Sequence, residues 1–317
     1  MLYVSTRNAV DAHTAYRAIH EQRAPDGGFY IPFHLPVYST EMLSSFRNKT
    51  QCEVIAAVLN DLFGTHLTGW DVECAAGRMP VNVEFMNQKV IFAECWNNPK
   101  GSFDYLLASL YALLTGSERC SVKPGGWARI AIGISVYFAL CSVLDIFETG
   151  IDLAVSMEDF SDVTAAMLAK EMGFPLNTLI CACDRNSGAW NLINKGELNA
   201  CASLVGQGNA KSDFMELFIH RYIGDEEVQR YLDACSHNVP YRIKQESLQA
   251  LSRNVFAFVI SDYRIETVSN GLSRTNGYVV DADTAMAYAA LQDYRASTGM
   301  NKETLILAML RLQQDKE

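Results

Sequence analysis

The sequence lacks a cluster of basic residues, an apolar leader and any apolar run long enough to cross a bilayer. Acidic residues outnumber basic ones by 36 to 26, and the net charge of −10 disfavours binding to nucleic acid. The longest uncharged apolar run, Ile130–Leu144, falls short of the ~20 residues that span a bilayer. The N-terminus has no apolar core of the kind found in secretory leaders. We therefore expect a cytoplasmic protein with no membrane or nucleic-acid partner.

A zinc-ligand pattern is also lacking. The nine cysteines are scattered through apolar segments, and the six histidines have no metal-binding spacing. Only Cys181 and Cys183 lie close together in the sequence, in a stretch that is typical of a buried strand. An odd number of cysteines in apolar surroundings favours reduced, buried thiols over disulfides. We predict no metal site.

The composition is that of a globular protein, with 49% hydrophobic and 20% charged residues. Short apolar strands alternate with long apolar helices, beginning with a strand at Val90–Ala93 and a helix that starts near Phe103. Further strands are expected at 153–156, 179–183 and 255–260, and further helices at 127–147, 162–172, 214–222, 226–234, 245–253, 262–272 and 283–294. This alternation predicts a doubly wound α/β sheet with a more helical C-terminal part.

The N-terminal part of the chain differs, because it mixes short strands with short helices. Its expected elements are a strand at Leu2–Ser5, a helix at Asp11–Gln22, a turn at Ala24–Gly28, a short extended piece at Phe29–Pro32 and a helix at Cys52–Phe63 ended by Gly64. We therefore divide the chain into an N-terminal domain, residues 1–90, and a larger α/β domain, residues 91–317.

Several segments, in the same order along the chain, resemble sequence motifs of threonine synthase. Tyr3–Arg7 resembles the opening Y-x-S-T-R of that family, and Ala24–Pro32 resembles its D-G-G-L-Y-V-P. The other matching segments are Glu94–Phe103, Gly126–Ile130, Met157–Pro175 and Gly277–Ala285. They extend over nearly the whole chain, and their order is what identifies a threonine synthase-like protein.

The resemblance implies the fold type II architecture of pyridoxal-phosphate (PLP) enzymes, similar to tryptophan synthase β. In that family a long segment follows the helix that starts at the position of Phe103. It carries an S-G-D-T-G loop and most of a small mobile domain. Here only Thr115–Gly126 intervene before the next motif, and S-G-D-T-G occurs nowhere in the sequence. We expect a doubly wound sheet whose small mobile domain is largely deleted.

The family places its Schiff-base lysine directly after the phenylalanine that corresponds to Phe103. In this sequence that position holds Asp104, and a carboxylate cannot form a Schiff base. Lys100, four residues earlier in the chain, is the nearest substitute. A loop lysine beside proline and glycine is also typical of a solvent-exposed side chain, and we favour that interpretation.

The family's S-G-N-F-G phosphate loop corresponds to Met157, Glu158, Asp159, Phe160 and Ser161. Glycines let the backbone approach a phosphate at a helix N-terminus, and both glycine positions are filled here. The two added carboxylates would repel a phosphate. Acidic residues also suit the first turn of a helix, so we favour a structural role with Asp159 or Ser161 as the N-cap.

Two further family features bear on the site. A Ser-Thr pair that follows a C-terminal strand binds the pyridine nitrogen in the family, and here Ala308 and Met309 occupy that position. Arg129, which in the family lies near the substrate, is retained. It is a candidate for binding an anion, although an ion pair with Glu158, Asp159 or Asp162 is the interpretation we favour.

These departures predict a protein that does not bind PLP and is catalytically inactive, with no catalytic, cofactor-binding or metal-binding residues. It would act as a binding or regulatory protein, as a homo-oligomer or with a threonine synthase-like relative, because loss of the small domain leaves apolar surface to cover. One alternative is a PLP-dependent lyase that uses a displaced lysine such as Lys100. The other is a sensor of small anions or amino acids that uses Arg129.

Overall fold

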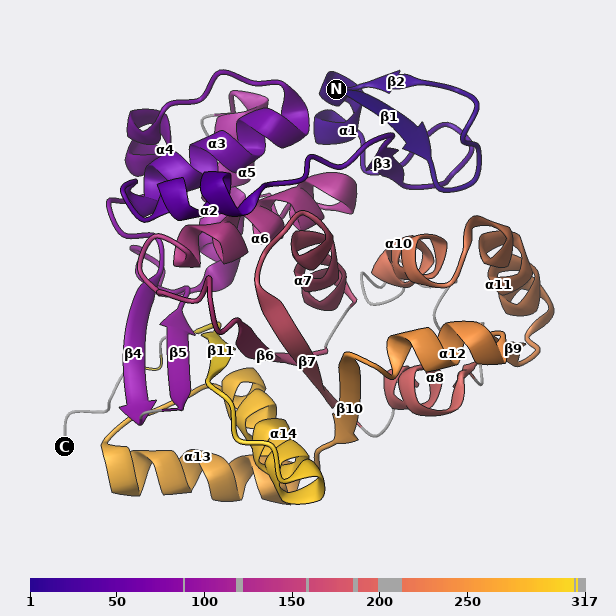
Figure 1. The fold of residues 1–317 in the computed structure, drawn as a ribbon. Coiled ribbons are helices and arrows are strands. Elements are labelled where there is room, and N and C mark those ends of the chain that lie inside the picture. Colours follow the sequence, from indigo (N-terminus) through magenta and orange to yellow (C-terminus); the bar gives the residue numbers. More distant parts are fainter. Residues whose placement is uncertain are drawn as a thin grey trace.

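The computed structural model describes residues 1–87, 89–117, 122–157, 160–184, 188–198, 213–310 and 312 (Figure 1). Its centre is a six-stranded sheet with the strand order β10-β7-β6-β11-β5-β4. The strands are β4 (Asn82–Asn87), β5 (Val90–Glu94), β6 (Ile151–Ser156), β7 (Leu176–Cys183), β10 (Val255–Val259) and β11 (Thr304–Ala308). All neighbouring pairs are parallel except the pair of β4 with β5. The chain therefore has the mixed α/β fold, dominated by parallel strands, that its sequence predicts.

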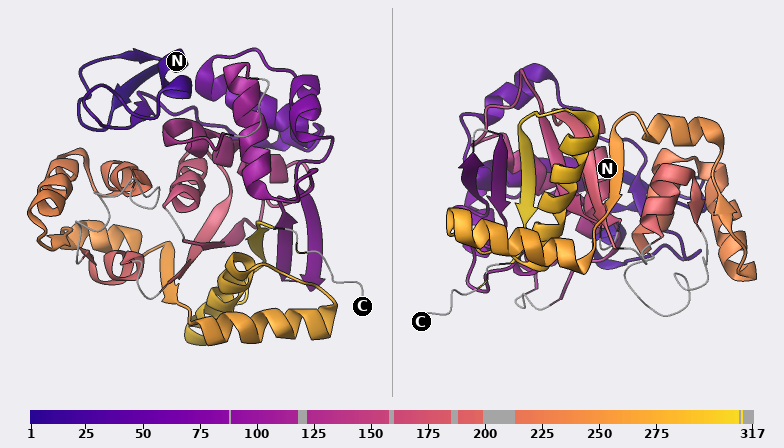
Figure 2. Two further views of the ribbon diagram at one scale, coloured as in Figure 1. Left: turned by 180° about the vertical axis from the view of Figure 1, so that it is seen from behind. Right: turned by 90° about the horizontal axis from the view of Figure 1, so that it is seen from below.

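Helices cover both faces of this sheet, as in a doubly wound fold (Figure 2). One face packs against α5 (Phe103–Thr115), α6 (Gly126–Leu140) and α7 (Ser161–Glu171). The other face packs against α13 (Asp262–Asn276) and α14 (Ala282–Thr298). Residues along each strand alternate between the two hydrophobic clusters: Leu153 and Val155 belong to the first and Ala154 to the second. Both faces of the sheet are thus buried, which explains why its central strands are mostly apolar.

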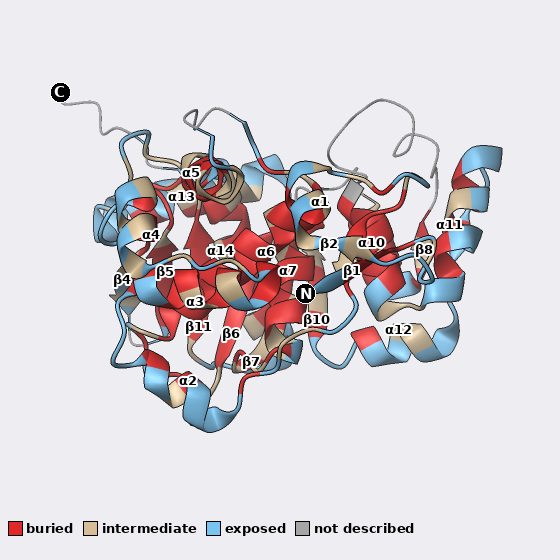
Figure 3. Ribbon diagram, turned by 90° about the horizontal axis from the view of Figure 1, so that it is seen from above, coloured by how far each residue is buried: buried red, intermediate tan, exposed pale blue. Residues whose placement is uncertain are grey.

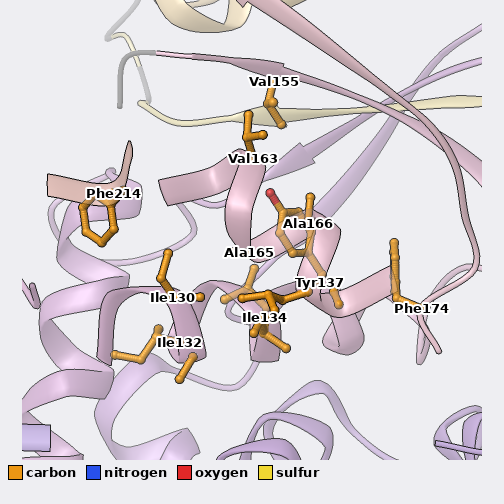
Figure 4. Packing of buried hydrophobic residues seen from close by; sticks show 14 of the residues in the cluster. Ile130, Ile132, Ile134, Tyr137, Val155, Val163, Ala165, Ala166, Phe174 and Phe214 are labelled. Carbon is orange, nitrogen blue, oxygen red and sulfur yellow. The ribbon is translucent and has the colours of Figure 1, made fainter. Parts of the chain in front are cut away.

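The helix α6 forms the centre of the larger cluster. Its central residues are buried on every side, and Ile130 and Ile134 have no exposed surface. Figure 4 shows these isoleucines beside Ala165 and Ala166 of α7. At Gly133 a side chain would meet the Cβ of Ala165 at 3.1 Å, so the two helices approach too closely for a larger residue there.

The N-terminal part contains a three-stranded sheet of order β2-β1-β3 and four helices. These elements are β1 (Leu2–Ser5), β2 (His13–Thr14), β3 (Tyr30–Pro32), α1 (Ala15–His20), α2 (Thr40–Phe46), α3 (Gln51–Phe63) and α4 (Gly69–Ala76). The helix α3 packs against α6 and so joins this part to the main core. A division of the chain at residue 90 stays a prediction, and β4, which precedes that residue, pairs with β5 in the large sheet.

A third group of elements lies beyond β7, between it and β10 in the chain (Figure 1). It comprises α8 (Ala189–Lys195), β8 (Glu197–Leu198), α10 (Asp213–Tyr222), α11 (Asp225–His237), β9 (Tyr241–Arg242) and α12 (Gln245–Leu251). Figure 3 shows α10 as a buried element, whereas α11 and α12 expose much of their surface. The buried helix α10 contacts both the N-terminal part, at Phe29, and the start of α7, at Phe160.

Some sequence-based expectations need correction. The expected helix at 127–147 ends at Leu140, because the apolar residues beyond it are buried in turns rather than in a helix. The helix expected at 11–22 is confined to Ala15–His20. Cys74 is exposed, while the other described cysteines are buried, and none of these cysteines is in a disulfide within the described part of the chain. Within the described ranges, every helix is too short or too polar to cross a bilayer.

Candidate functional site

The carboxyl ends of the parallel strands are where α/β sheets of this kind bind ligands. Here these ends bring together Glu94 of β5, Ser156 of β6 and Ala308 of β11. The first residues of α5 and α14 reach the same edge. The backbone N–H of Phe103 donates to the carbonyl of Met309 at 2.8 Å, and Ser156 Oγ donates to Asp283 at 2.9 Å. We take this edge as the candidate site.

Asp104 lies in the first turn of α5, where Ser102 is the N-cap and accepts from the N–H of Tyr105. A carboxylate there is favoured by the partial positive charge at the helix N-terminus. Its Oδ2 lies 2.5 Å from Nζ of Lys123, and the two side chains are 56% and 70% exposed. The position of the family's lysine is therefore occupied by the acidic partner of an exposed ion pair.

Lys100 lies on the loop that joins β5 to α5. The loop is ordered by Asn98, whose Nδ2 donates to the carbonyl of Ser102 at 2.8 Å and whose Oδ1 accepts from the N–H of Lys100 at 3.2 Å. Gly101 supports the turn with φ of 62°, a value that favours glycine. The side chain of Lys100 is exposed. This geometry fits a solvent-exposed loop lysine, and a Schiff-base role for Lys100 stays a hypothesis.

Backbone N–H groups hold the chain that follows β11, and the residues after Ala308 include no Ser, Thr or Tyr. Ala308 is fully buried in the sheet. The N–H of Met309 donates to Thr284 Oγ1 at 3.4 Å, and the N–H of Leu310 donates to Asp281 Oδ2 at 3.2 Å. The start of α14 thus binds the segment in which the family places its partner for the pyridine nitrogen.

The segment that corresponds to the phosphate loop is buried where it is described. Met157 and Phe160 are buried, and the ring of Phe160 lies 5.0 Å from that of Phe218 on α10. The N-cap of α7 is Phe160, with no side-chain cap, so the expectation that Ser161 caps this helix is wrong. Ser161 is instead a fully buried residue of the first turn. Glu158 and Asp159 lie outside the described residues.

Arg129 lies beneath this loop, on the first turn of α6. Its Nη2 donates to Oδ1 of Asp162 at 2.7 Å, and the two side chains are 11% and 13% exposed. The guanidinium also sits over the ring of Phe103, 5.3 Å from its centre, and so connects α5, α6 and α7. The ion pair expected as one interpretation of Arg129 is present, and binding of an external anion by Arg129 stays a prediction.

Several polar residues of the edge did not emerge from the sequence. Glu94 accepts from Tyr278 Oη at 2.7 Å and from Asn82 Nδ2 at 2.8 Å. Burial and the Glu94 carboxylate both raise the pKa of Tyr278, so its hydroxyl remains a donor at neutral pH. Asp281 caps α14 and accepts from Thr284. Both Tyr278 and Asp281 lie in the Gly277–Ala285 motif, and that motif was the signal in the sequence that could have pointed to them.

These residues do not fit PLP. The position that needs an amine holds Asp104, and its nearest cation already pairs with it. The position that needs a hydroxyl holds Ala308, which has no polar side chain. At the N-terminus of α7, the position of the phosphate loop holds the aromatic ring of Phe160, which packs against Phe218. Among the described residues, no three His, Cys, Asp or Glu side chains converge in a way that could hold a metal ion.

Comparisons with known proteins agree with the motif order. A sequence model described as "Threonine synthase N terminus" matches residues 2–74. Threonine synthase of Pseudomonas aeruginosa is 26% identical over 222 residues, which are 68% of this chain and 46% of that protein. Human threonine synthase-like 1 is 24% identical over 190 residues, 54% of this chain and 25% of that protein. The chain thus matches less than half the length of these curated relatives.

Solved structures show the same fold. PLP-bound threonine synthase from Brucella melitensis superimposes with a TM-score of 0.82 at 18% identity, covering 98% of this chain and 89% of that one. Yeast threonine synthase gives a TM-score of 0.80 at 14% identity, covering 98% and 87%. The chain therefore has the fold of solved PLP-dependent threonine synthases, and its residues 2–74 are similar to the threonine synthase N terminus.

Proposed function

We propose that this threonine synthase-like protein does not bind PLP and acts as a non-catalytic binding or regulatory protein. The observation that carries the proposal is Asp104, which stands at the lysine position and pairs with Lys123. An acidic side chain there repels the phosphorylated cofactor and offers no amine. The departures at Ala308 and Phe160 support the same conclusion, because they remove two other contacts that the family uses.

The partner in this proposal is a second copy of the chain or a threonine synthase-like relative. Exposed apolar side chains of the N-terminal part supply surface for such a contact: Leu2 is 58% exposed, Phe33 58% and Val37 70%. Light scattering on a size-exclusion column tests self-association. A strict monomer at all concentrations would contradict the homo-oligomer and leave the relative as the partner to test.

Absorbance spectroscopy tests the loss of the cofactor. The purified chain should be colourless, and titration with PLP should produce no saturable band beyond that of free PLP. A matched variant, Asp104→Lys, restores the amine at the family's position. A saturable band in the unmodified chain would refute the proposal and favour an enzyme with a displaced lysine such as Lys100.

The sensor alternative predicts a different response. Thermal shift assays with phosphorylated amino acids and nucleotides would detect a ligand, and Arg129→Lys should weaken its effect while largely keeping the charge. Stabilisation by a ligand that survives this change would place the binding elsewhere. No response to any of these compounds would count against a sensor.

A further inference from the structure

Helix α10 carries a buried carboxylate that is bound by the N-terminal Ser5-Thr6-Arg7 segment. Glu216 is 3% exposed. Its Oε1 accepts from Thr6 Oγ1 at 2.7 Å and from Arg7 Nε at 3.0 Å, and its Oε2 accepts from Arg7 Nη2 at 2.7 Å. Two parallel bonds from one guanidinium are the strongest arrangement available to an arginine and a carboxylate. Arg23 adds a second positive charge, with Nη1 3.8 Å from Oε2.

The Ser5-Thr6-Arg7 segment is itself held rigidly by the turn at residues 24–28. Ser5 Oγ donates to Asp26 Oδ1 at 2.7 Å, and Thr6 Oγ1 accepts from the N–H of Phe29 at 2.8 Å. A side chain at Gly28 would come within 2.2 Å of Ser5 Oγ, so glycine is required there. The donors that face Glu216 are thus held in place by contacts within the N-terminal part.

Aromatic residues connect α10 both to α7 and to the N-terminal part. Phe218 is fully buried, and its ring contacts Phe160, the N-cap of α7. Phe214, one turn earlier, stacks on Phe29 at 6.2 Å. In Figure 1, α10 lies beside α7 and below the three-stranded sheet of the N-terminal part. One short helix therefore joins the N-terminal segment to the loop before α7.

We propose that Thr6, Arg7 and Glu216 form a clamp that fixes α10 and, through the contact of Phe218 with Phe160, holds the N-terminus of α7 in place. A buried carboxylate that loses its partner must regain water, and α10 would have to move away from the N-terminal segment to provide it. That movement would withdraw Phe218 from Phe160. The inference rests on these contacts alone and does not depend on the proposed function.

Hydrogen exchange measured by mass spectrometry on the full chain tests the clamp. The informative amides are those of Thr164 to Met167, because Thr164 makes the first backbone bond of α7, to Phe160. In Arg7→Ala and Glu216→Gln these amides should exchange faster by more than about tenfold. The matched control Arg47→Ala removes an exposed ion pair with Asp145 and should leave their exchange unchanged.

Two further variants separate a clamp from a merely structural contact. Phe218→Leu should speed the same α7 amides while leaving β1 and β3 protected, and adding Arg7→Ala to it should bring little further change. If Glu216→Gln fails to fold, Thr6→Val removes a single donor and should give a smaller increase in exchange. Faster exchange in α10 with unchanged exchange at Thr164 to Met167 would overturn the proposal.

Discussion

The core around α6 and the carboxyl edge of the sheet lie next to each other but differ in what their side chains do. In the core, Ile130 and Ile134 pack without exposed surface. At the edge, the chain binds its own polar groups: Ser156 donates to Asp283, and Leu310 donates to Asp281. The core is therefore built from apolar packing, while the edge is built from polar contacts within the chain.

The difference shows that fold and chemistry are separable in this molecule. Packing depends on many apolar contacts that tolerate exchange among similar residues, whereas a cofactor site depends on a few specific groups. A TM-score of 0.82 to a PLP-bound threonine synthase at 18% identity reports the shared arrangement of the backbone. It does not report whether the groups of a cofactor site are present. The predictions below test this separation.

The largest effect is expected in the core. Ile134→Ala should lower the free energy of unfolding by about 2–5 kcal/mol, because Ile134 has no exposed surface and the neighbouring helices can close the cavity only partly. Chemical denaturation monitored by circular dichroism measures the loss. Val37→Ala is the control, since Val37 is 70% exposed. Equal losses for the two variants would contradict the description of the core.

A smaller loss is expected where the core meets the edge. Arg129→Ala should cost about 2–3 kcal/mol, because it leaves the carboxylate of Asp162 nearly buried without this partner. Denaturation curves of Arg129→Ala and Arg47→Ala should differ clearly, because the ion pair of Arg47 with Asp145 is exposed. An Arg129→Ala protein as stable as the parent would show that the ion pair does not hold α6 to α7.

Adding a side chain should be harmful at Gly126, the first residue of α6. Gly126 has φ of +53°, and an added Cβ would lie 2.5 Å from the carbonyl oxygen of Gln22. Gly126→Asn should therefore destabilise the protein by about 1–3 kcal/mol. Gly299→Asn is the matched control, because Gly299 has φ of +71° with open space around it. A neutral Gly126→Asn would contradict the close approach of these backbones.

The smallest effect is expected at the edge itself. Asp104→Asn should change the free energy of unfolding by less than about 1 kcal/mol, because the pair with Lys123 is exposed and screened by solvent. Unfolding of Asp104→Asn, Lys123→Ala and the double variant, at low and high salt, measures the coupling. A large coupling that salt does not weaken would mean that Asp104 has a structural role at the edge.

Much of the fold was predictable because its elements have clear ends. The helix expected at Cys52–Phe63 is α3, which Thr50 caps at one end and Gly64 at the other. The strand β4 and the helix α4 were missed. Half of the residues of the edge strand β4 are polar, and none of its residues is buried. The helix α4 begins at a glycine, although Thr68 and Asp71 form a capping box.

The candidate site was less predictable, since its contacts join distant parts of the sequence. Sequence patterns offered three acidic partners for Arg129, and only the fold places Asp162 beside it. The pairing of Asp104 with Lys123 crosses a segment with no strong periodicity. Phe160 gave no indication of its contact with Phe218, because an aromatic residue in a loop carries no information about its partner.

The central claim is that the edge holds no lysine in the position of a PLP enzyme. The most direct measurement is peptide mapping after incubation with PLP and reduction by borohydride, which fixes any Schiff base to its lysine. We expect only sparse labelling spread over exposed lysines such as Lys100 and Lys123, and a stoichiometric label at residue 104 only in Asp104→Lys. Stoichiometric labelling of one lysine in the unmodified chain, abolished by changing that residue to alanine, would contradict the account.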